Sequence, residues 1–362
     1  MSGDDEFRTL RLAKLERMRA LGRDPYAVER WQVDRSARQL LDRFESLQSE
    51  VVSFAGRVLS YRLMGKAGFA HVSDGDAQIQ CYFRKDDLSD EDWELYGLLD
   101  IGDHVGVEGE LFLTKTGEKS IHVRQLQPLS KCLHILPVGK EKDGQHWYGL
   151  ADVEQRYRHR HLDLISNKSS RESLVKRMQI TSAVRRFFDA RGFVEAETPI
   201  LQTVAGGAAA RTFETRYNAY DLDVKLRISL ELYLKRLICG DLPRVYEIGR
   251  VFRNEGVSNR HNPEFTLLEW YEAYANLEDV MKTVEELFEY TSKEVFGTSK
   301  IQFSDGTSLD FSQPWRRVDL VSSIEAKSGV RQEDLRSLEA AKAALGVSPL
   351  VNPATGKRII AE

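Results

Sequence analysis

The sequence is poor in cysteine and contains no long hydrophobic run. Its three cysteines, Cys81, Cys132 and Cys239, are odd in number and widely spaced. This pattern fits neither a disulfide framework nor a zinc site, and a reducing compartment is its simplest explanation. No run of about 18 apolar residues occurs, and the opening MSGDDEF is acidic and lacks the apolar segment of a signal peptide. We therefore expect a cytoplasmic protein rather than a secreted or membrane-inserted one.

The sequence also lacks an excess of positive charge. Its 362 residues include 52 Lys and Arg against 56 Asp and Glu, a formal net charge of −4. No overall positive field therefore attracts nucleic acid, and any RNA contact has to use local basic patches. With 41% hydrophobic and 30% charged residues, the composition is that of a globular protein, and the length allows two or three domains.

The most informative stretch spans residues 249–276 and reads GRVFRNEGVSNRHNPEFTLLEWYEAYAN. Apolar, β-biased segments at 245–252 and 265–270 flank a polar loop, which predicts two neighbouring antiparallel strands. Arginine forks for phosphate or carboxylate, an imidazole and an aromatic ring come from Arg253, Arg260, His261 and Phe265. These residue types together predict a nucleotide pocket. The alternative interpretation is a surface hairpin held by salt bridges.

The order FRNE, RHNPEF and an acidic-aromatic strand resembles motif 2 of the class II aminoacyl-tRNA synthetases, and is similar to the lysine enzymes rather than the aspartate or asparagine enzymes. The resemblance implies that Arg253 is the catalytic residue, bridging the α-phosphate of ATP and the amino-acid carboxylate. It also implies that Glu255 and Asn262 read the adenine edge, that His261 faces the outer phosphates, and that Phe265 stacks on the base.

An acidic amino-acid pocket is predicted beside this loop. Glu231 lies in an apolar run and needs a cationic partner, either a ligand ammonium or a protein side chain. Glu269 and Tyr271 share one face of the second strand. The resemblance implies that Gly207 and Glu231 hold the α-amino group of the substrate, and that Arg253, Glu269 and Tyr271 complete a lysine site. Lysine specificity comes from the resemblance alone.

Five short alternating segments between residues 51 and 130, with a helical stretch near 89–98, predict an OB-type barrel. The segments are VSFAGRVLS, FAHVSD, IQCYF, HVGVEGELFLT and SIHVRQLQP. In such barrels the face of strands two and three commonly binds single-stranded nucleic acid, for which Phe69, Gln80 and Tyr82 offer rings and polar groups.

RLMGKAGF at 62–69 and the IQ at 79–80 resemble the anticodon-binding barrel of the lysine enzymes. The resemblance implies that Arg62, Phe69 and Gln80 contact the uridine-rich anticodon of tRNA(Lys). For Phe69 the alternative is a place in the barrel core.

Periodicity predicts the remaining elements. Helices are expected at 6–22, 36–48, 171–191, 277–296 and 335–345, the fourth capped by Asn276 and ended by Gly297. A hairpin is expected at 301–311, turning at Asp305-Gly306. The basic side of the first helix suits either an RNA backbone or solvent. The 171–191 helix followed by FVEAETP resembles motif 1 of the class II enzymes, which implies a homodimer.

We therefore predict a multidomain α+β protein with an incomplete class II antiparallel-sheet catalytic core. The expected parts are an N-terminal helical segment (1–50), an OB-fold anticodon-binding domain (51–130), a linker (131–168) and the catalytic core (169–362). Two of the three linker residues Arg156, Arg158 and Arg160 are expected to form salt bridges between domains. The insert at 139–145 receives no role.

No Gly-x-Asp-Arg segment of the family's third motif occurs after residue 276. We therefore expect the ligands of the Mg²⁺ ions that the resemblance implies to lie outside this chain. Two functions compete: a lysine–tRNA ligase using ATP, lysine and tRNA(Lys), here incomplete, and a catalytically impaired tRNA- or nucleotide-binding relative. An OB-fold scaffold leaves the polar loop unexplained and ranks last.

Overall fold

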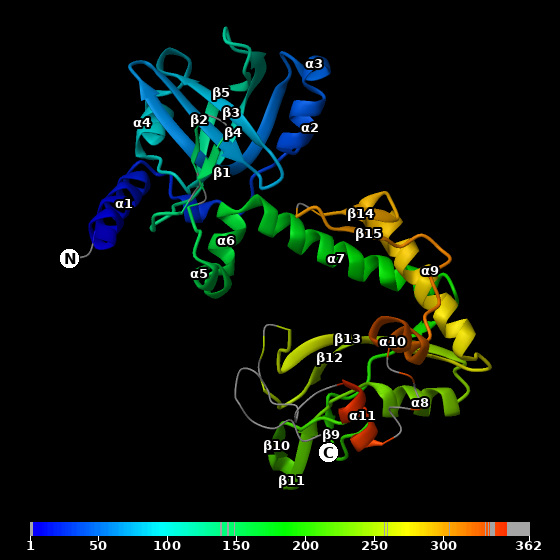
Figure 1. Cartoon of the computed structure of the whole chain (residues 1–362). Helices are drawn as coiled ribbons and strands as arrows, with labels where there is room; N and C mark the ends of the chain where they lie inside the picture. Colours follow the sequence, from blue (N-terminus) through cyan, green and yellow to red (C-terminus); the bar gives the residue numbers. More distant parts are fainter. Residues whose placement is uncertain are drawn as a thin grey trace. The chain divides into compact units, whose positions relative to one another are not determined.

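The computed structural model describes residues 3–345, except for short gaps at 138–139, 143–144, 148, 257, 259, 304, 330, 332 and 334–336 (Figure 1). The chain forms two compact units, Met1–Val175 and Lys176–Glu362. Within the described ranges, no helix has the length and apolar character needed to cross a membrane.

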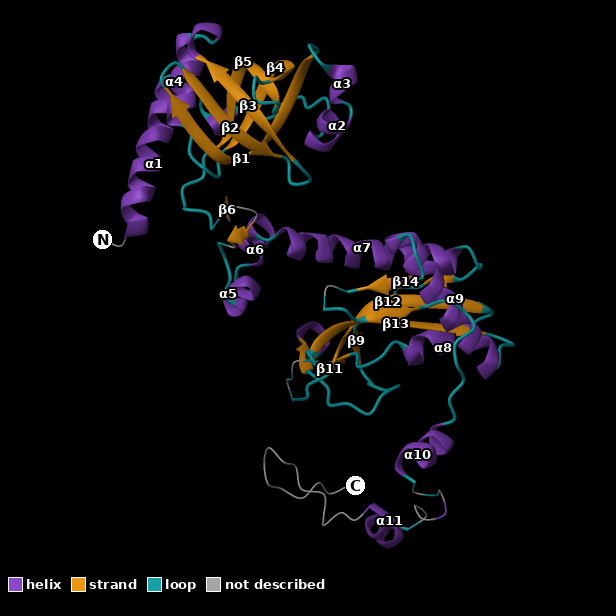
Figure 2. Ribbon diagram, turned by 45° about the horizontal axis from the view of Figure 1, so that its top comes forward, coloured by secondary structure: helices purple, strands orange, loops and turns teal. Residues whose placement is uncertain are grey.

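The first unit is built around a closed five-stranded barrel, as predicted (Figure 2). Its strands are β1 (Val51–Met64), β2 (Ala67–Ser73), β3 (Gln78–Arg84), β4 (His104–Leu113) and β5 (Lys119–Ser130). They follow the order β1-β2-β3-β5-β4 around the barrel, and β1 and β4 close it by antiparallel pairing. Alternate residues point inward, so one set of side chains forms the core and the other faces out. Cys81 of β3 belongs to the core and is completely buried.

Short helices cover the barrel. They are α1 (Gly3–Ala20), α2 (Ala37–Asp42), α3 (Phe44–Leu47) and α4 (Asp90–Leu98), with 3₁₀ turns at Pro25–Ala27 and Lys85–Asp87. The single helix expected at 36–48 is divided at Arg43, whose φ of −105° and ψ of 17° leave the helical range. On α1, Lys14 binds Asp100 and Arg17 binds Glu94. These basic side chains are therefore engaged by the barrel unit itself.

Gly68 of β2 allows an aromatic side chain to pack closely against the β1–β2 pair. A Cβ atom on Gly68 would lie 2.3 Å from the ring of Tyr96 on α4. Because glycine lacks that atom, the ring packs against β2, and its hydroxyl donates to the carbonyl of Arg62 at 2.8 Å. The hydrogen bond from Tyr96 of α4 therefore holds the backbone of Arg62 in place.

The linker region contains β6 (Lys140–Lys142), β7 (Gln145–Trp147), α5 (Val153–Arg158) and α6 (Arg160–Ser166). The strands β6 and β7 pair antiparallel within the insert. Arg156 and Arg160 both bind Asp163, at 2.8 and 2.6 Å. The expectation of salt bridges between domains was wrong for these two arginines, since their partner lies in the linker itself. Arg158 pairs with Glu154 one helical turn away.

The second unit is organised by a three-stranded sheet with the order β13-β12-β8. Strands β12 (Arg244–Phe252) and β13 (Glu264–Glu272) are the predicted antiparallel pair, and β8 (Val194–Glu195) runs parallel to β12. On one face, Phe188 of α7 (Lys168–Asp189) stacks on Tyr246 with ring centroids 4.9 Å apart. On the other face, the core contains Leu234 of α8 (Glu231–Cys239).

The other elements of the second unit are β9 (Leu201–Gln202), β10 (Glu214–Tyr217), β11 (Leu222–Leu226), α9 (Leu277–Phe296), β14 (Lys300–Gln302), β15 (Ser308–Asp310), α10 (Leu320–Ser328) and α11 (Leu338–Leu345), with a 3₁₀ turn at Asn218–Tyr220. The prediction that Asn276 caps α9 is confirmed, because it forms a capping box with Asp279. Gly297 ends that helix at a φ of 72°. The hairpin turning at Asp305-Gly306 is also confirmed, whereas α10 was not predicted.

Candidate active site and nucleic-acid interface

Arg253 and Phe265 lie together where the β12–β13 hairpin opens into its loop. Val251 pairs with Phe265 in the strand register, and the amide of Arg253 donates to the carbonyl of Pro263 at 2.8 Å. The guanidinium carbon of Arg253 lies 5.2 Å from the centre of the Phe265 ring. Its Nε donates to the carbonyl of Ile228 at 3.3 Å. The predicted arginine and aromatic ring are therefore neighbours, and the guanidinium retains further donors for an anion.

Glu269 and Tyr271 follow on the same face of β13 and are partly buried. Glu269 accepts the amide of Leu230 at 3.2 Å. Burial raises the pKa of Glu269, although that hydrogen bond and Arg253 act in the opposite direction. The pKa of Tyr271 is raised to about 12, chiefly by burial and then by the nearby charges of Glu269 and Glu231. Glu231, Glu269 and Tyr271 therefore form a cluster close to Arg253.

Gly207 and Glu231 meet across Ser229. Gly207 has a φ of +85°, and a Cβ atom on it would lie 2.1 Å from the Ser229 Oγ and 2.8 Å from the Glu231 Cβ. The Ser229 hydroxyl donates to the carbonyl of Gly206 at 3.0 Å and accepts the amide of Glu231 at 3.3 Å. Sequence reasoning missed Ser229. Only glycine fits the backbone so closely against it at this φ.

The carboxylate of Glu231 is bound by the ammonium of Lys235, one turn further along α8. The Lys235 Nζ also lies 6.0 Å from the centre of the Tyr271 ring. The structure thus contains the protein partner that the alternative interpretation required for Glu231. It also shows that the space between Glu231 and Tyr271 accommodates an ammonium group, which these acidic and aromatic neighbours stabilise.

A buried ion pair lies close to Glu269 and joins the Arg227 segment to β12. Arg227 donates to Glu247 at 2.7 Å, and both side chains are only 3% exposed. Thr198 donates to the second oxygen of Glu247 at 2.6 Å, and Arg227 also donates to the carbonyl of Arg250 at 2.8 Å. Sequence reasoning missed this network because its three members lie far apart in the chain. Alternation along β12 places Glu247 inward, and that was the available signal.

The other residues predicted to bind ATP are exposed. Glu255 is exposed and borders an open hollow of about 570 Å³ together with Arg211. His261 is exposed in the loop, where its Nδ1 lies 2.8 Å from the Ser258 hydroxyl. Asn262 is exposed beside it. The structure therefore brings Arg253, Phe265 and the acidic residues together, whereas His261 and Asn262 remain on the loop.

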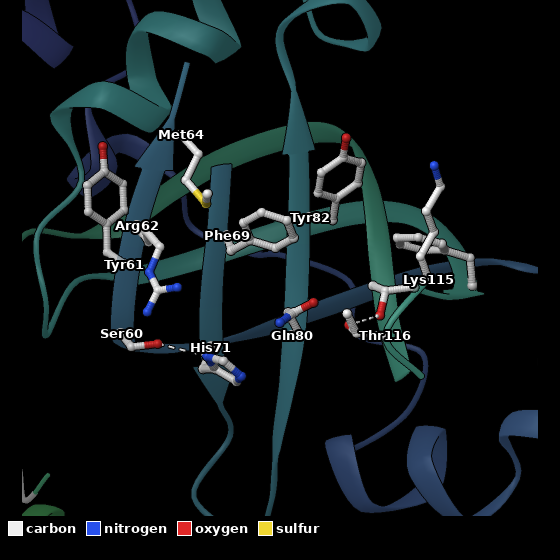
Figure 3. Close-up of a pocket in the computed structure, with 12 residues that line it drawn as sticks. Ser60, Tyr61, Arg62, Met64, Phe69, His71, Gln80, Tyr82, Lys115 and Thr116 are labelled. Atoms are coloured by element: carbon white, nitrogen blue, oxygen red, sulfur yellow. Dashed lines mark hydrogen bonds between the residues drawn. The ribbon is translucent and has the colours of Figure 1, made fainter. Parts of the chain in front are cut away.

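On the barrel, Arg62, Phe69 and Gln80 line one cavity of about 570 Å³. Figure 3 shows these side chains on one face of β1, β2 and β3, with Phe69 and Tyr82 side by side. The two rings have centroids 5.1 Å apart. The remaining lining residues are Ser60, Tyr61, Met64, His71, Phe112, Thr114, Lys115 and Thr116. Phe69 thus borders the cavity rather than the barrel core, and Phe112, His71 and Lys115 are lining residues that sequence reasoning missed.

The Mg²⁺ that the resemblance implies is assigned no ligands here. Among the residues with a described placement, no group of three His, Cys, Asp or Glu side chains is arranged to hold a metal ion.

Sequence comparisons agree with this architecture. Residues 152–346 match the profile of the class II tRNA synthetases (D, K and N), and residues 52–129 match that of the OB-fold nucleic acid binding domain. Because the first match covers more than half of the chain, the chain belongs to the class II tRNA synthetases of the D, K and N group.

Within this group, the chain is similar to lysine–tRNA ligases. The chain is 46% identical over 333 residues to a lysine–tRNA ligase of Thermoanaerobacter sp. (strain X514), covering 92% of this chain and 65% of the relative. It is 47% identical over 325 residues to a lysine–tRNA ligase of Syntrophomonas wolfei, covering 90% and 64%. The chain therefore spans about two thirds of the length of the curated relatives that it matches.

Proposed function

We propose that this chain is the anticodon-binding and amino-acid-activating part of a lysine–tRNA ligase. The observation that carries the proposal is the cluster of Glu231, Glu269 and Tyr271 near Arg253, in which Glu231 and Tyr271 flank the ammonium group of Lys235. A pocket that holds an ammonium next to a guanidinium and an aromatic ring suits a cationic amino acid joined to an adenylate.

The proposed reaction needs no side-chain nucleophile. The lysine carboxylate attacks the α-phosphate of ATP and pyrophosphate leaves; the lysyl group then passes to the terminal ribose of tRNA. Catalysis consists of positioning and of stabilising the charge that builds at the α-phosphate. Arg253 would hold that phosphate and the carboxylate, while Phe265 stacks on adenine. Glu255, His261 and Asn262 would reach ATP from the loop and Mg²⁺ would accompany its phosphates.

In the amino-acid pocket, Gly207 and Glu231 would hold the α-amino group, and Glu269 and Tyr271 the side-chain ammonium. The close packing of Gly207 against Ser229 and Glu231 supports the first assignment, because it holds the Glu231 side chain next to the Gly207 backbone. The raised pKa of Glu269, caused chiefly by burial and then by the charge of Glu231, supports the second, because a bound cation would stabilise its carboxylate.

The barrel would bind the anticodon of tRNA(Lys) through Arg62, Phe69 and Gln80. A cavity combining a guanidinium, paired rings and an amide is suited to stacked bases and their phosphates. We also propose a cytoplasmic homodimer that contacts its copy through the region of α7 and β8, on the resemblance of that region to motif 1.

Lysine binding tests the proposal directly. Equilibrium dialysis of labelled lysine, with aspartate and asparagine as competitors, should show saturable binding that only lysine displaces. Glu269→Gln should weaken it at least tenfold. Glu264→Gln is the matched control, since Glu264 begins the same strand but is exposed and pairs with Arg250 at 3.5 Å. Absence of saturable binding, or equal effects of the two substitutions, would refute the proposal.

The lysine–tRNA ligase relatives do not favour the impaired-relative alternative, and its one structural argument is the Lys235–Glu231 ion pair, which engages a carboxylate assigned to lysine. Lysine-dependent exchange of pyrophosphate into ATP separates the two functions. Exchange that requires Arg253 identifies a ligase. Binding of lysine and ATP without exchange favours the alternative.

A further inference from the structure

The cavity floor on the barrel consists of two parallel rows of side chains that run across the strands. In the first row, Arg62 of β1 pairs in register with Phe69 of β2, which pairs with Tyr82 of β3. In the second row, Ser60 pairs with His71. Residues of one row are separated from those of the other by two positions along each strand, so both rows point to the same face.

The second row continues to Gln80 and Ser120. His71 pairs in register with Gln80, and Gln80 pairs with Ser120 of β5. Directly opposed residues have Cβ atoms about 5 Å apart. Imidazole and amide therefore stand side by side under the same cavity, next to the row of rings on which a base could stack.

Each end of this polar row is fixed by a serine. The Ser60 hydroxyl lies 2.8 Å from the His71 Nδ1, and the Ser120 hydroxyl donates to the Gln80 Oε1 at 2.9 Å. Because the Gln80 oxygen is engaged, its amide presents N–H donors to a ligand. In Figure 3 the His71 nitrogen opposite Ser60 lies on the Gln80 side of the ring. Each serine thus holds one atom of its partner and leaves a second polar atom for the cavity.

We infer that His71, positioned by Ser60, is a second base-reading residue beside Gln80 and determines which base of single-stranded RNA the cavity prefers. The inference rests on the proposed role of the barrel in RNA binding. Stacking on Phe69 and Tyr82 is available to every base and cannot discriminate. Discrimination requires hydrogen-bonding groups aimed at a base edge, and His71 is the lining residue next to Gln80 whose ring is already held in one orientation. A core role does not account for His71, since its ring is partly exposed and borders the cavity.

The test measures dissociation constants of the full chain for short single-stranded uridine, cytidine, adenosine and inosine oligomers at one salt concentration. For wild type we expect at least a tenfold range between the tightest and weakest oligomer. His71→Ala should compress that range to threefold or less, and Ser60→Ala should compress it partly. Phe69→Ala should weaken all four oligomers. His161→Ala, at an exposed histidine of α6, is the matched control and should change nothing.

A measurement independent of substitution accompanies these variants. In chain labelled with ¹⁵N-histidine, the preferred oligomer should shift the ring nitrogen resonances of His71 but not those of His161. This readout holds even if a variant is poorly folded.

The outcomes separate the inference from the proposed function. If Phe69→Ala weakens binding while His71→Ala retains the wild-type range, or if the His71 nitrogens do not respond, the barrel binds RNA but the inference is wrong. If His71→Ala weakens all oligomers equally, His71 contributes affinity without reading the base, and the inference is again wrong. If wild type binds none of the oligomers, RNA binding by the barrel itself is refuted, and the inference with it.

Discussion

The buried pair of Arg227 and Glu247 yields the sharpest prediction on stability. Replacing Glu247 by Ala removes the carboxylate that accepts from Arg227 and Thr198, and leaves an uncompensated guanidinium that is 3% exposed. Breaking a buried pair from one side costs about 3–5 kcal/mol. Since a domain is stable by only about 5–15 kcal/mol, the second unit should lose about a fifth of its stability or more.

Replacing both partners gives a smaller expected effect. In Arg227→Met with Glu247→Leu no charge remains buried, and such exchanges are often close to neutral. Arg227 also donates to the carbonyls of Thr198 and Arg250. The double variant should therefore still lose about 1 kcal/mol for each of these orphaned carbonyls, but less in total than Glu247→Ala.

Hydrogen exchange read by mass spectrometry measures both effects in one chain. Peptides from β12 should exchange faster in Glu247→Ala, while peptides from β3 of the barrel serve as the internal reference. Glu264→Ala is the control, because the Arg250–Glu264 pair also holds β12 but is about half exposed on both sides. Exposed pairs are worth about 1 kcal/mol or less. Equal effects of Glu247→Ala and Glu264→Ala on β12 would refute the reasoning.

Three further predictions follow from the site and the linker. Because the pKa of Glu269 is raised in the folded chain, its contribution to stability is present below the ordinary carboxyl pKa and is lost as the pH rises. Glu269→Gln should therefore raise the melting temperature of the second unit at pH 7 and not at pH 4, as differential scanning calorimetry would show. Burial alone would raise the pKa of Asp163, but hydrogen bonds from Asn167, Arg156, Ser170 and Arg160 lower it to about 2. Asp163→Asn should thus speed exchange in α5 and α6 at pH 7, and the difference from wild type should vanish as the pH falls from about 4 to 2; an unchanged difference would contradict this. Gly207→Ala should weaken lysine binding in equilibrium dialysis at least tenfold, because its methyl group would collide with Ser229, whereas unchanged affinity would place the α-amino group elsewhere.

The sequence predicted those parts of the fold that local pattern determines. Alternation located all five barrel strands and the β12–β13 pair, and Asn276 with Gly297 marked both ends of α9. The resemblance supplied the roles of Arg253, Phe265 and the acidic residues, which the structure indeed places close together. Local signals were sufficient for these elements because each is specified by neighbours in the chain.

The sequence did not reveal contacts between distant segments. Nothing near Arg227 in the sequence points to Glu247, twenty positions later, or to Thr198 on another segment. The division of 36–48 at Arg43 and the pairing of Arg156 and Arg160 with Asp163 were also missed, although these features are local in sequence. The pairing of His71 with Gln80 depends on strand register, which periodicity alone does not determine.

Alkylation of the buried Cys81 thiol can be used to measure how often the barrel opens. Its side chain lies in the core between Ala70 and Ile121 of the neighbouring strands, and burial raises its pKa, so the reactive thiolate is suppressed while the strands stay paired. Cys132 is partly exposed and Cys239 is exposed. After these two thiols have been alkylated, each slow modification that follows records one opening of the barrel, and its rate can be compared with and without bound RNA.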